Sequence, residues 1–241
     1  MKHLLKLLDC STEEIIGLLD LADQLKYEKK HNISHRHLEG KSLGMIFQKS
    51  STRTRVSFET GMYQLGGQAL FLSNRDLQIG RGEPVQDTAR VLSRYLDGIM
   101  IRTYEQKEVE DLAGYGTIPI INGLTDFCHP CQVLADLMTI REKFAVLEGL
   151  KMCYIGDGNN MANSLIVGGL KTGMKVSVAT PEGYRPHPEV MAFAGANPDF
   201  SITDDPMKAA ENADVVITDT WASMGMEAEK EVRMQAFQGY Q

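Results

Sequence analysis

Short apolar runs alternate with longer amphipathic runs along most of the chain. Ser11, followed three residues later by Glu14, forms a capping-box pattern that predicts the start of a first helix. The strands predicted after it cover residues 42–47, 66–72, 98–101 and 117–123. The helices predicted between these strands cover residues 56–65, 84–96 and 105–113.

The same alternation begins again after a helical pattern at about residues 131–144. Strands are predicted at 151–156, 175–180, 200–203 and 214–218, and helices at 159–173, 187–195 and 205–213. Continuous apolar strands that alternate with helices are typical of parallel sheets covered on both faces. We therefore predict two doubly wound α/β domains, residues 1–140 with the linking helix and residues 141–241.

The composition is that of an ordinary globular protein, with 43% hydrophobic and 24% charged residues among 241. A net charge of -7 argues against a nucleic-acid-binding protein. No apolar run approaches the length of a membrane span, and the N-terminus lacks a signal-peptide pattern, so we expect a cytoplasmic protein with no membrane partner. The pair Cys128 and Cys131 cannot complete a zinc site, although a redox role stays open.

Polar clusters follow several of the predicted strands. They are "QKSSTRTR" after 42–47, Arg102 after 98–101, "GDGNN" after 151–155 and "DTWASMG" after 214–218. Ligands of open parallel sheets bind at the carboxyl ends of the strands. The clusters therefore indicate where a ligand site would form.

The stretch from Ser51 to Arg55 has the chemistry of an anion site. A helix that begins there presents free backbone N–H groups and the positive end of its dipole. Hydroxyl side chains and the planar forks of Arg53 and Arg55 add donors that suit a phosphate or carboxylate. Simple N-capping beside two solvated arginines is the alternative interpretation.

The other clusters are less specific. Gly156 and Gly158 lack the third glycine of a dinucleotide-binding loop, so a tight turn explains them as well as a nucleotide does. His129 with Gln132 suits a ligand or a structural histidine equally. Asp219, at a strand end, could hold a ligand amine or cap a turn.

Taken together, these motifs resemble the transcarbamoylase family. "STRTR" at 51–55 resembles its carbamoyl-phosphate motif, and "HPCQ" at 129–132 resembles its H-P-x-Q motif. "DGNN" at 157–160 and "DTWASMG" at 219–225 are similar to the ornithine branch of the family. The resemblance extends over nearly the whole chain and implies two α/β domains with the active site in the cleft between them.

The resemblance also implies a role for each matching residue. The residues that would hold the phosphate of carbamoyl phosphate are Ser51, Thr52, Arg53 and Thr54. Arg102 would bridge the phosphate and the carbonyl oxygen, His129 would donate to that oxygen, and Gln132 would fix the carbamoyl amide. The residues that would bind the amino-acid end of ornithine are Asn160, Asp219, Ser223 and the backbone at Met224.

The reaction that the resemblance implies is attack by the side-chain amine of ornithine on carbamoyl phosphate, which gives citrulline and phosphate. It requires no metal and no organic cofactor. The family works as trimers, so a homotrimer or a multiple of trimers is expected, with Gln78 reaching into the site of a neighbouring subunit.

The sequence departs from the family pattern at its end. Family chains continue with an H-C-L-P motif, a further phosphate-binding arginine and a final helix, none of which follows "AFQGYQ" here. We therefore expect an incomplete second domain. The alternatives are a catalytically impaired fragment retained for assembly, a transcarbamoylase for another amine such as putrescine, or a nucleotide-binding module.

Overall fold

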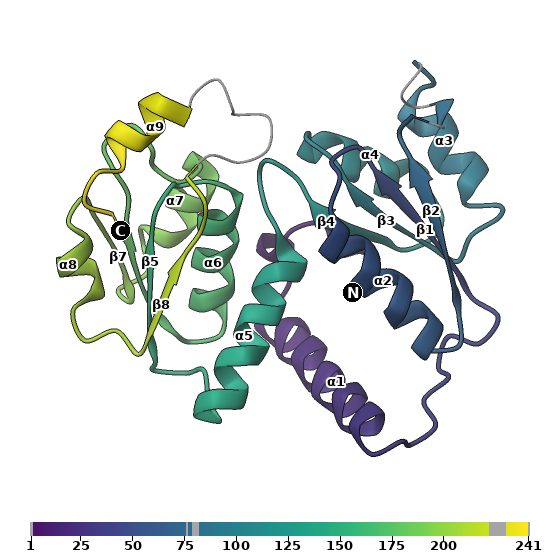
Figure 1. The fold of residues 1–241 in the computed structure, drawn as a ribbon, viewed down its shortest axis with the longest axis horizontal. Helices are drawn as coiled ribbons and strands as arrows, with labels where there is room; N and C mark the ends of the chain where they lie inside the picture. The colour runs from purple at the N-terminus through teal and green to yellow at the C-terminus, as the bar shows by residue number, and fades with distance from the viewer. Residues whose placement is uncertain (1, 76, 79–81, 222–229, 241) are drawn as a thin grey trace. The chain divides into compact units, whose positions relative to one another are not determined.

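The predicted alternation of strands and helices is confirmed in the computed structural model, which describes residues 2–75, 77–78, 82–221 and 230–240 (Figure 1). The chain forms two units. Unit 1 comprises Met1–Cys10 and Gly17–Cys131, and unit 2 comprises Ser11–Ile16 and Gln132–Gln241. The helices α1 (Thr12–Lys30) and α5 (Pro130–Phe144) each contribute residues to both units. The domain boundary expected between residues 140 and 141 stays a prediction.

Unit 1 is built on a parallel sheet with the strand order β2-β1-β3-β4. Its strands are β1 (Ser42–Phe47), β2 (Gln68–Ser73), β3 (Gly98–Arg102) and β4 (Ile120–Leu124). Its helices are η1 (Leu7–Asp9), α2 (Thr52–Gln64), α3 (Val85–Leu92) and α4 (Gln106–Tyr115). The strands of this sheet are the predicted ones, in a doubly wound arrangement.

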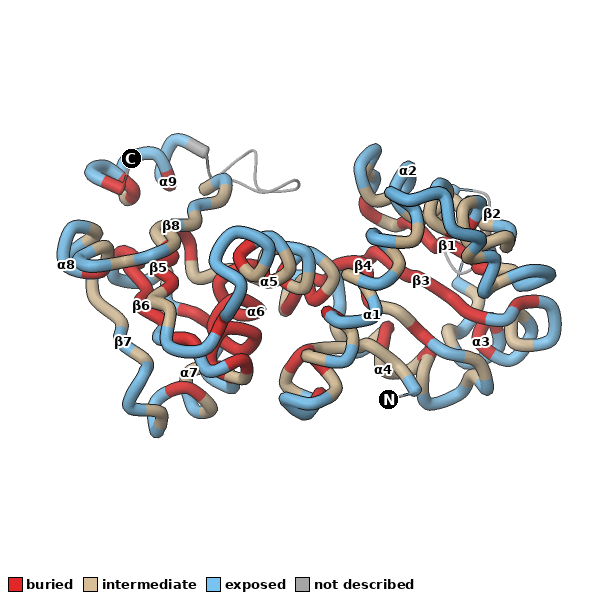
Figure 2. Tube along the Cα trace, turned by 90° about the horizontal axis from the view of Figure 1, so that it is seen from below, coloured by how far each residue is buried: buried red, intermediate tan, exposed pale blue. Residues whose placement is uncertain are grey.

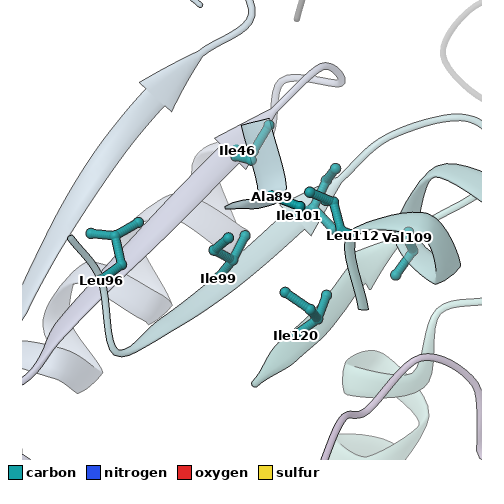
Figure 3. Packing of buried hydrophobic residues seen from close by; sticks show 8 residues of the cluster. All are labelled: Ile46, Ala89, Leu96, Ile99, Ile101, Val109, Leu112 and Ile120. Carbon is teal, nitrogen blue, oxygen red and sulfur yellow. The ribbon is translucent and has the colours of Figure 1, made fainter. Parts of the chain in front are cut away.

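Alternate residues of the central strands pack on opposite faces of this sheet. On one face, Leu43, Met45 and Phe47 of β1 pack with Met62 of α2. The opposite face carries the cluster Ile46, Ala89, Leu96, Ile99, Ile101, Val109, Leu112 and Ile120, which includes residues of α3 and α4 (Figure 3). Because β1 and β3 are covered on both sides, they are buried along almost their whole length (Figure 2).

Unit 2 repeats the design with the strand order β7-β6-β5-β8. Its strands are β5 (Lys151–Ile155), β6 (Lys175–Ala179), β7 (Phe200–Thr203) and β8 (Val215–Thr218). Its helices are α6 (Asn160–Lys171), α7 (Pro188–Ala194), α8 (Pro206–Ala210) and α9 (Lys230–Ala236). On one face of the sheet, Cys153 and Ala179 pack with Ala209 of α8 and with Phe237 and Tyr240, which follow α9.

Local signals account for most of the element boundaries. Ser11 and Glu14 form the expected capping box, with Glu14 N donating to Ser11 Oγ (3.2 Å) and Ser11 N donating to Glu14 Oε2 (3.0 Å). Helix α2 begins at Thr52, before the predicted start at residue 56. The prediction differs because the first turn is polar and lies outside the apolar periodicity. No helix in the described part of the chain is long and apolar enough to cross a membrane.

The buried cluster of unit 1 generates a stability prediction. Ile99→Ala removes a fully buried side chain from β3 and should lower the free energy of unfolding by about 2–5 kcal/mol, because the cavity cannot collapse completely. Urea denaturation measures this change. Val91→Ala on α3 is the control, because Val91 is 50% exposed. A shift for Ile99→Ala as small as that of the control would contradict the packing described.

Candidate functional sites in the two units

The predicted anion site forms at the start of α2. Ser51 is the N-cap, and its Oγ accepts from Thr54 N (3.2 Å) and donates to Thr54 Oγ1 (3.0 Å). Thr52 and Arg53 lie in the first turn with exposed side chains. Because α2 starts here, its free N–H groups add hydrogen-bond donors, and its dipole adds partial positive charge, beside these two exposed side chains. The structure therefore brings Ser51, Thr52, Arg53 and Thr54 together at one helix N-terminus.

Arg102 lies close to this helix start because of strand pairing. It is the last residue of β3, and β3 pairs with β1 so that Arg102 is opposite Phe47. Its side chain is buried, and its Nε has no hydrogen-bond partner among the described residues. Burial lowers the pKa of Arg102, and the like charge of Arg53 lowers it further. Two guanidinium groups that repel each other beside a helix N-terminus favour a bound anion.

His129 immediately precedes α5 and also interacts with Arg102. Burial lowers the pKa of His129 to about 4, and the positive charge of Arg102 contributes to this shift. The imidazole is therefore neutral at neutral pH. A neutral imidazole beside a buried arginine can act as a hydrogen-bond partner without adding a third positive charge.

Of the two cysteines that flank His129, Cys128 is a buried residue and Cys131 a partly buried one. Cys128 Sγ donates to Leu5 O (3.5 Å), and Cys131 Sγ donates to Asn122 O (3.4 Å). Burial raises the pKa of each thiol to about 12, so neither forms a thiolate at neutral pH. This environment disfavours the redox role that the C-x-x-C spacing left open.

Gln132 and Gln78 lie at exposed positions. Gln132 is in the first turn of α5, is counted with unit 2, and donates through Nε2 to Asp136 Oδ1 (2.9 Å). Gln78 is in the segment after β2, where its backbone oxygen accepts from Glu83 N (3.1 Å). Among the described residues, no contact joins Gln132 or Gln78 to Arg53 or Arg102.

In unit 2, the "GDGNN" segment is a tight turn and a helix cap. Gly156 has a φ of 151°, and a Cβ at Gly158 would lie 2.4 Å from the backbone of residues 184–186. Asn159 caps α6 by accepting from Met161 N (2.9 Å), and Asn160 begins the helix with a partly buried side chain. The glycines are therefore explained by backbone geometry, without a nucleotide.

Asp219 follows β8, at the same end of the sheet as the "GDGNN" turn. β8 pairs with β5, and Ile155 is opposite Thr218. The negative charge of Asp219 contributes, after burial, to raising the pKa of Asp136 and of Tyr154. Its carboxylate therefore adds negative charge to a partly buried region, which favours a cation. Ser223 and Met224 lie outside the described residues.

The sequence analysis missed two side-chain networks, one buried and one partly buried. Arg233 of α9 pairs with Asp157 (2.6 Å) and also donates to Trp221 O (3.1 Å). In unit 1, Glu108 accepts hydrogen bonds from Gln48 Nε2 and from Thr103 Oγ1. Neither pair has a local sequence signal. Arg233 and Asp157 are 76 residues apart, and Gln48 and Glu108 are 60 residues apart.

A large hollow in unit 1 is separate from the predicted anion site. Its volume is about 650 Å³, and its lining includes Leu43, Phe58, Met62 and Ile121. The lining also includes Ser42 and Gly98, the first residues of β1 and β3. The hollow is therefore apolar and lies at the amino ends of the strands, whereas the arginines lie at the carboxyl ends.

Both units match known sequence families. Residues 2–142 match the carbamoyl-P binding domain of aspartate/ornithine carbamoyltransferase, and residues 148–241 match the Asp/Orn binding domain. Ornithine carbamoyltransferase of Oceanobacillus iheyensis is 56% identical over 245 residues, which cover 100% of this chain and 76% of the relative. The anabolic ornithine carbamoyltransferase of Pyrococcus furiosus is 55% identical and covers 100% of this chain and 78% of the relative.

Solved structures give the same result. Ornithine carbamoyltransferase from Pyrococcus furiosus superposes with a TM-score of 0.93 and 55% identity, over 98% of this chain and 77% of that chain. The anabolic enzyme from Campylobacter jejuni superposes with a TM-score of 0.91 and 42% identity, over 99% and 79%. With both domains matched in sequence and fold, the chain belongs to the aspartate/ornithine carbamoyltransferase family.

Proposed function

We propose that this protein transfers the carbamoyl group of carbamoyl phosphate to the side-chain amine of L-ornithine, giving L-citrulline and phosphate. The observation that carries the proposal is the pair of guanidinium groups of Arg53 and Arg102 at the N-terminus of α2, with the Nε of Arg102 buried. A phosphate dianion offers the negative charge and the acceptors that this arrangement needs. The relatives named for the same reaction support the choice of substrates.

The phosphate end of carbamoyl phosphate would bind to Ser51, Thr52, Arg53 and Thr54. When the amine nitrogen attacks the carbonyl carbon, the carbon–oxygen bond to phosphate breaks and phosphate leaves with the electron pair. The donors around α2 stabilise the charge of that leaving group. The ornithine amine must first lose a proton, because the reference pKa of such an amine is about 10.4.

Negative charge grows on the carbonyl oxygen during the attack. Arg102 and neutral His129 would donate to this oxygen, and Gln132 would fix the carbamoyl amide. One such donor lowers the barrier by about 3 kcal/mol in comparable sites. No step in this scheme uses a metal or an organic cofactor.

The acceptor would bind through residues of unit 2. Asp219 would pair with the α-ammonium group of ornithine, and Asn160, Ser223 and the backbone of Met224 would complete the site. The support for Asp219 is the negative charge that it adds to a partly buried region. The same proposal includes a homotrimer or a multiple of trimers, with exposed Gln78 donated to a neighbouring subunit, and a cytoplasmic location.

The direct experiment measures phosphate release from carbamoyl phosphate, together with the carbamoylated product, for each of three acceptors, L-ornithine, putrescine and L-aspartate. The proposal expects product from ornithine in clear excess over the other two acceptors. Preferential use of putrescine would identify a different acceptor site. Phosphate binding without any product would favour an impaired copy.

The first prediction concerns the anion site. Arg53→Ala removes a charge-assisted contact and should weaken the binding of inorganic phosphate by about tenfold, as measured by calorimetry. Arg55→Ala is the matched control, because it removes the same charge but Arg55 pairs with Glu59 (3.0 Å). Equal effects of the two changes would show that only net charge matters here.

The second prediction concerns the choice of acceptor. Asp219→Asn should raise the KM for ornithine by about tenfold or more, because a partly buried charge-assisted pair is lost, while phosphate affinity stays unchanged. Steady-state kinetics and phosphate calorimetry on the same protein separate the two effects. If phosphate binding falls and the ornithine KM stays constant, the roles of the two sites have been exchanged.

The third prediction concerns pH. Because the pKa of His129 is about 4 in the folded protein, its imidazole should stay neutral between about pH 8 and about pH 5. An unfolded histidine titrates near 6.5, so the unfolded state binds the proton first, and stability falls as pH drops from about 6.5 towards about 4. NMR titration beside His129→Asn, which identifies the ring signal, measures this pKa. A midpoint near 6.5 would contradict the burial described.

A further inference from the structure

The loop between β1 and α2 is fastened to the end of β3. Gln48 N and Lys49 N both donate to Arg102 O, at 2.9 and 3.3 Å. These bonds hold the backbone of the anion-binding loop against the residue whose side chain supplies the second guanidinium. The position of Arg102 is therefore coupled to the segment that leads into α2.

One carboxylate joins the same two strand ends through their side chains. Glu108, in the first turn of α4, accepts from Thr103 Oγ1 at 2.5 Å and from Gln48 Nε2. Thr103 is fully buried and directly follows Arg102, and Gln48 directly follows the last residue of β1. Glu108 thus connects the ends of β1 and β3 through the side chains of Gln48 and Thr103.

The anion site needs such a connection because its two positive charges repel each other and so oppose the arrangement that binds an anion. The guanidinium groups of Arg53 and Arg102 repel each other when no anion lies between them. Arg53 is carried by the first turn of α2, and Arg102 by the end of β3. Movement of the loop from Gln48 to Ser51 would relieve this repulsion, and the bonds from the loop to Arg102 O and the ion pair between Lys49 and Asp126 oppose that movement.

We propose that Glu108 is a positioning residue: through Gln48 and Thr103 it holds the ends of β1 and β3 at the spacing at which Arg53 and Arg102 bind one phosphate group together. The inference rests on the proposed function, since it assumes that unit 1 binds the phosphate of carbamoyl phosphate. Glu108 itself does not touch the substrate in this account.

Two substitutions at position 108 separate geometry from charge. Glu108→Gln removes the charge but keeps the bridge, because Gln48 can rotate its amide and accept from the new amide while Thr103 donates to its oxygen. Glu108→Met is similar in length and removes the charge and both acceptors. Simple Coulomb attraction predicts slightly tighter phosphate binding for both variants, since each removes a negative charge near an anion site.

The proposal predicts a different result. Phosphate affinity by calorimetry should fall by about tenfold or more in Glu108→Met and stay within about twofold of wild type in Glu108→Gln. Glu110→Met is the control on the same helix, because Glu110 forms only a distant pair with Lys6 (3.7 Å) among the contacts described. All affinities are compared well below each variant's unfolding temperature, so that a loss of stability alone changes none of them.

A second measurement needs no ligand. Hydrogen exchange of the Gln48 and Lys49 amides, which donate to Arg102 O, should accelerate in Glu108→Met and not in Glu108→Gln or Glu110→Met. Equal phosphate affinity in Glu108→Met and wild type, or equal loss in Glu108→Met and Glu108→Gln, overturns the proposal. A wild-type protein that binds no phosphate overturns the proposed function instead, and the exchange rates then decide whether Glu108 restrains the loop.

Discussion

The parallel pairing of β1 with β3 is the constraint on which the candidate chemistry of unit 1 depends. It sets Phe47 opposite Arg102, so that the chain leaving β1 enters α2 next to a buried guanidinium. The apolar cluster on the face covered by α3 and α4 keeps both strands in this register (Figure 3). A one-residue shift of the register between β1 and β3 would turn every side chain of the shifted strand to the other face. The packing of the core and the position of Arg102 therefore depend on the same register.

The two units use one architecture for opposite charges. In unit 1, the carboxyl ends of the strands present Arg53, Arg102 and a helix N-terminus. In unit 2, the corresponding ends present Asp219 and a turn whose Asp157 is neutralised by Arg233. A positive site suits a phosphate and a negative site suits an ammonium group, which is the division of substrates that the two matched family domains describe.

Sequence patterns predicted the strands well, because each is a short apolar run, and the central strands β1 and β3 are buried on both faces. The start of α2 was predicted too late, since its first turn is polar and invisible to apolar periodicity. Helix α9 was not predicted because, unlike the similarly short α7 and α8, it has no proline in its first turn to mark a helix start. The pairs of Glu108 with Gln48 and of Arg233 with Asp157 were not identifiable, because the partners are 60 and 76 residues apart and only the folded chain brings them together. The motifs "STRTR" and "HPCQ" did indicate Arg53 and His129, and the fold adds that Arg102 interacts with both.

We infer that Arg53 and Arg102 jointly bind one phosphate group at the N-terminus of α2. A crystal structure of the protein with a stable phosphonate analogue of carbamoyl phosphate tests it most directly. We expect phosphonate oxygens within hydrogen-bond distance of the Arg53 guanidinium, of Arg102 Nε and of the backbone N–H groups of residues 52 and 53, since the N–H of Thr54 donates to Ser51 Oγ. A phosphonate bound elsewhere, or Arg102 Nε bonded to a protein acceptor while the analogue is present, would contradict it.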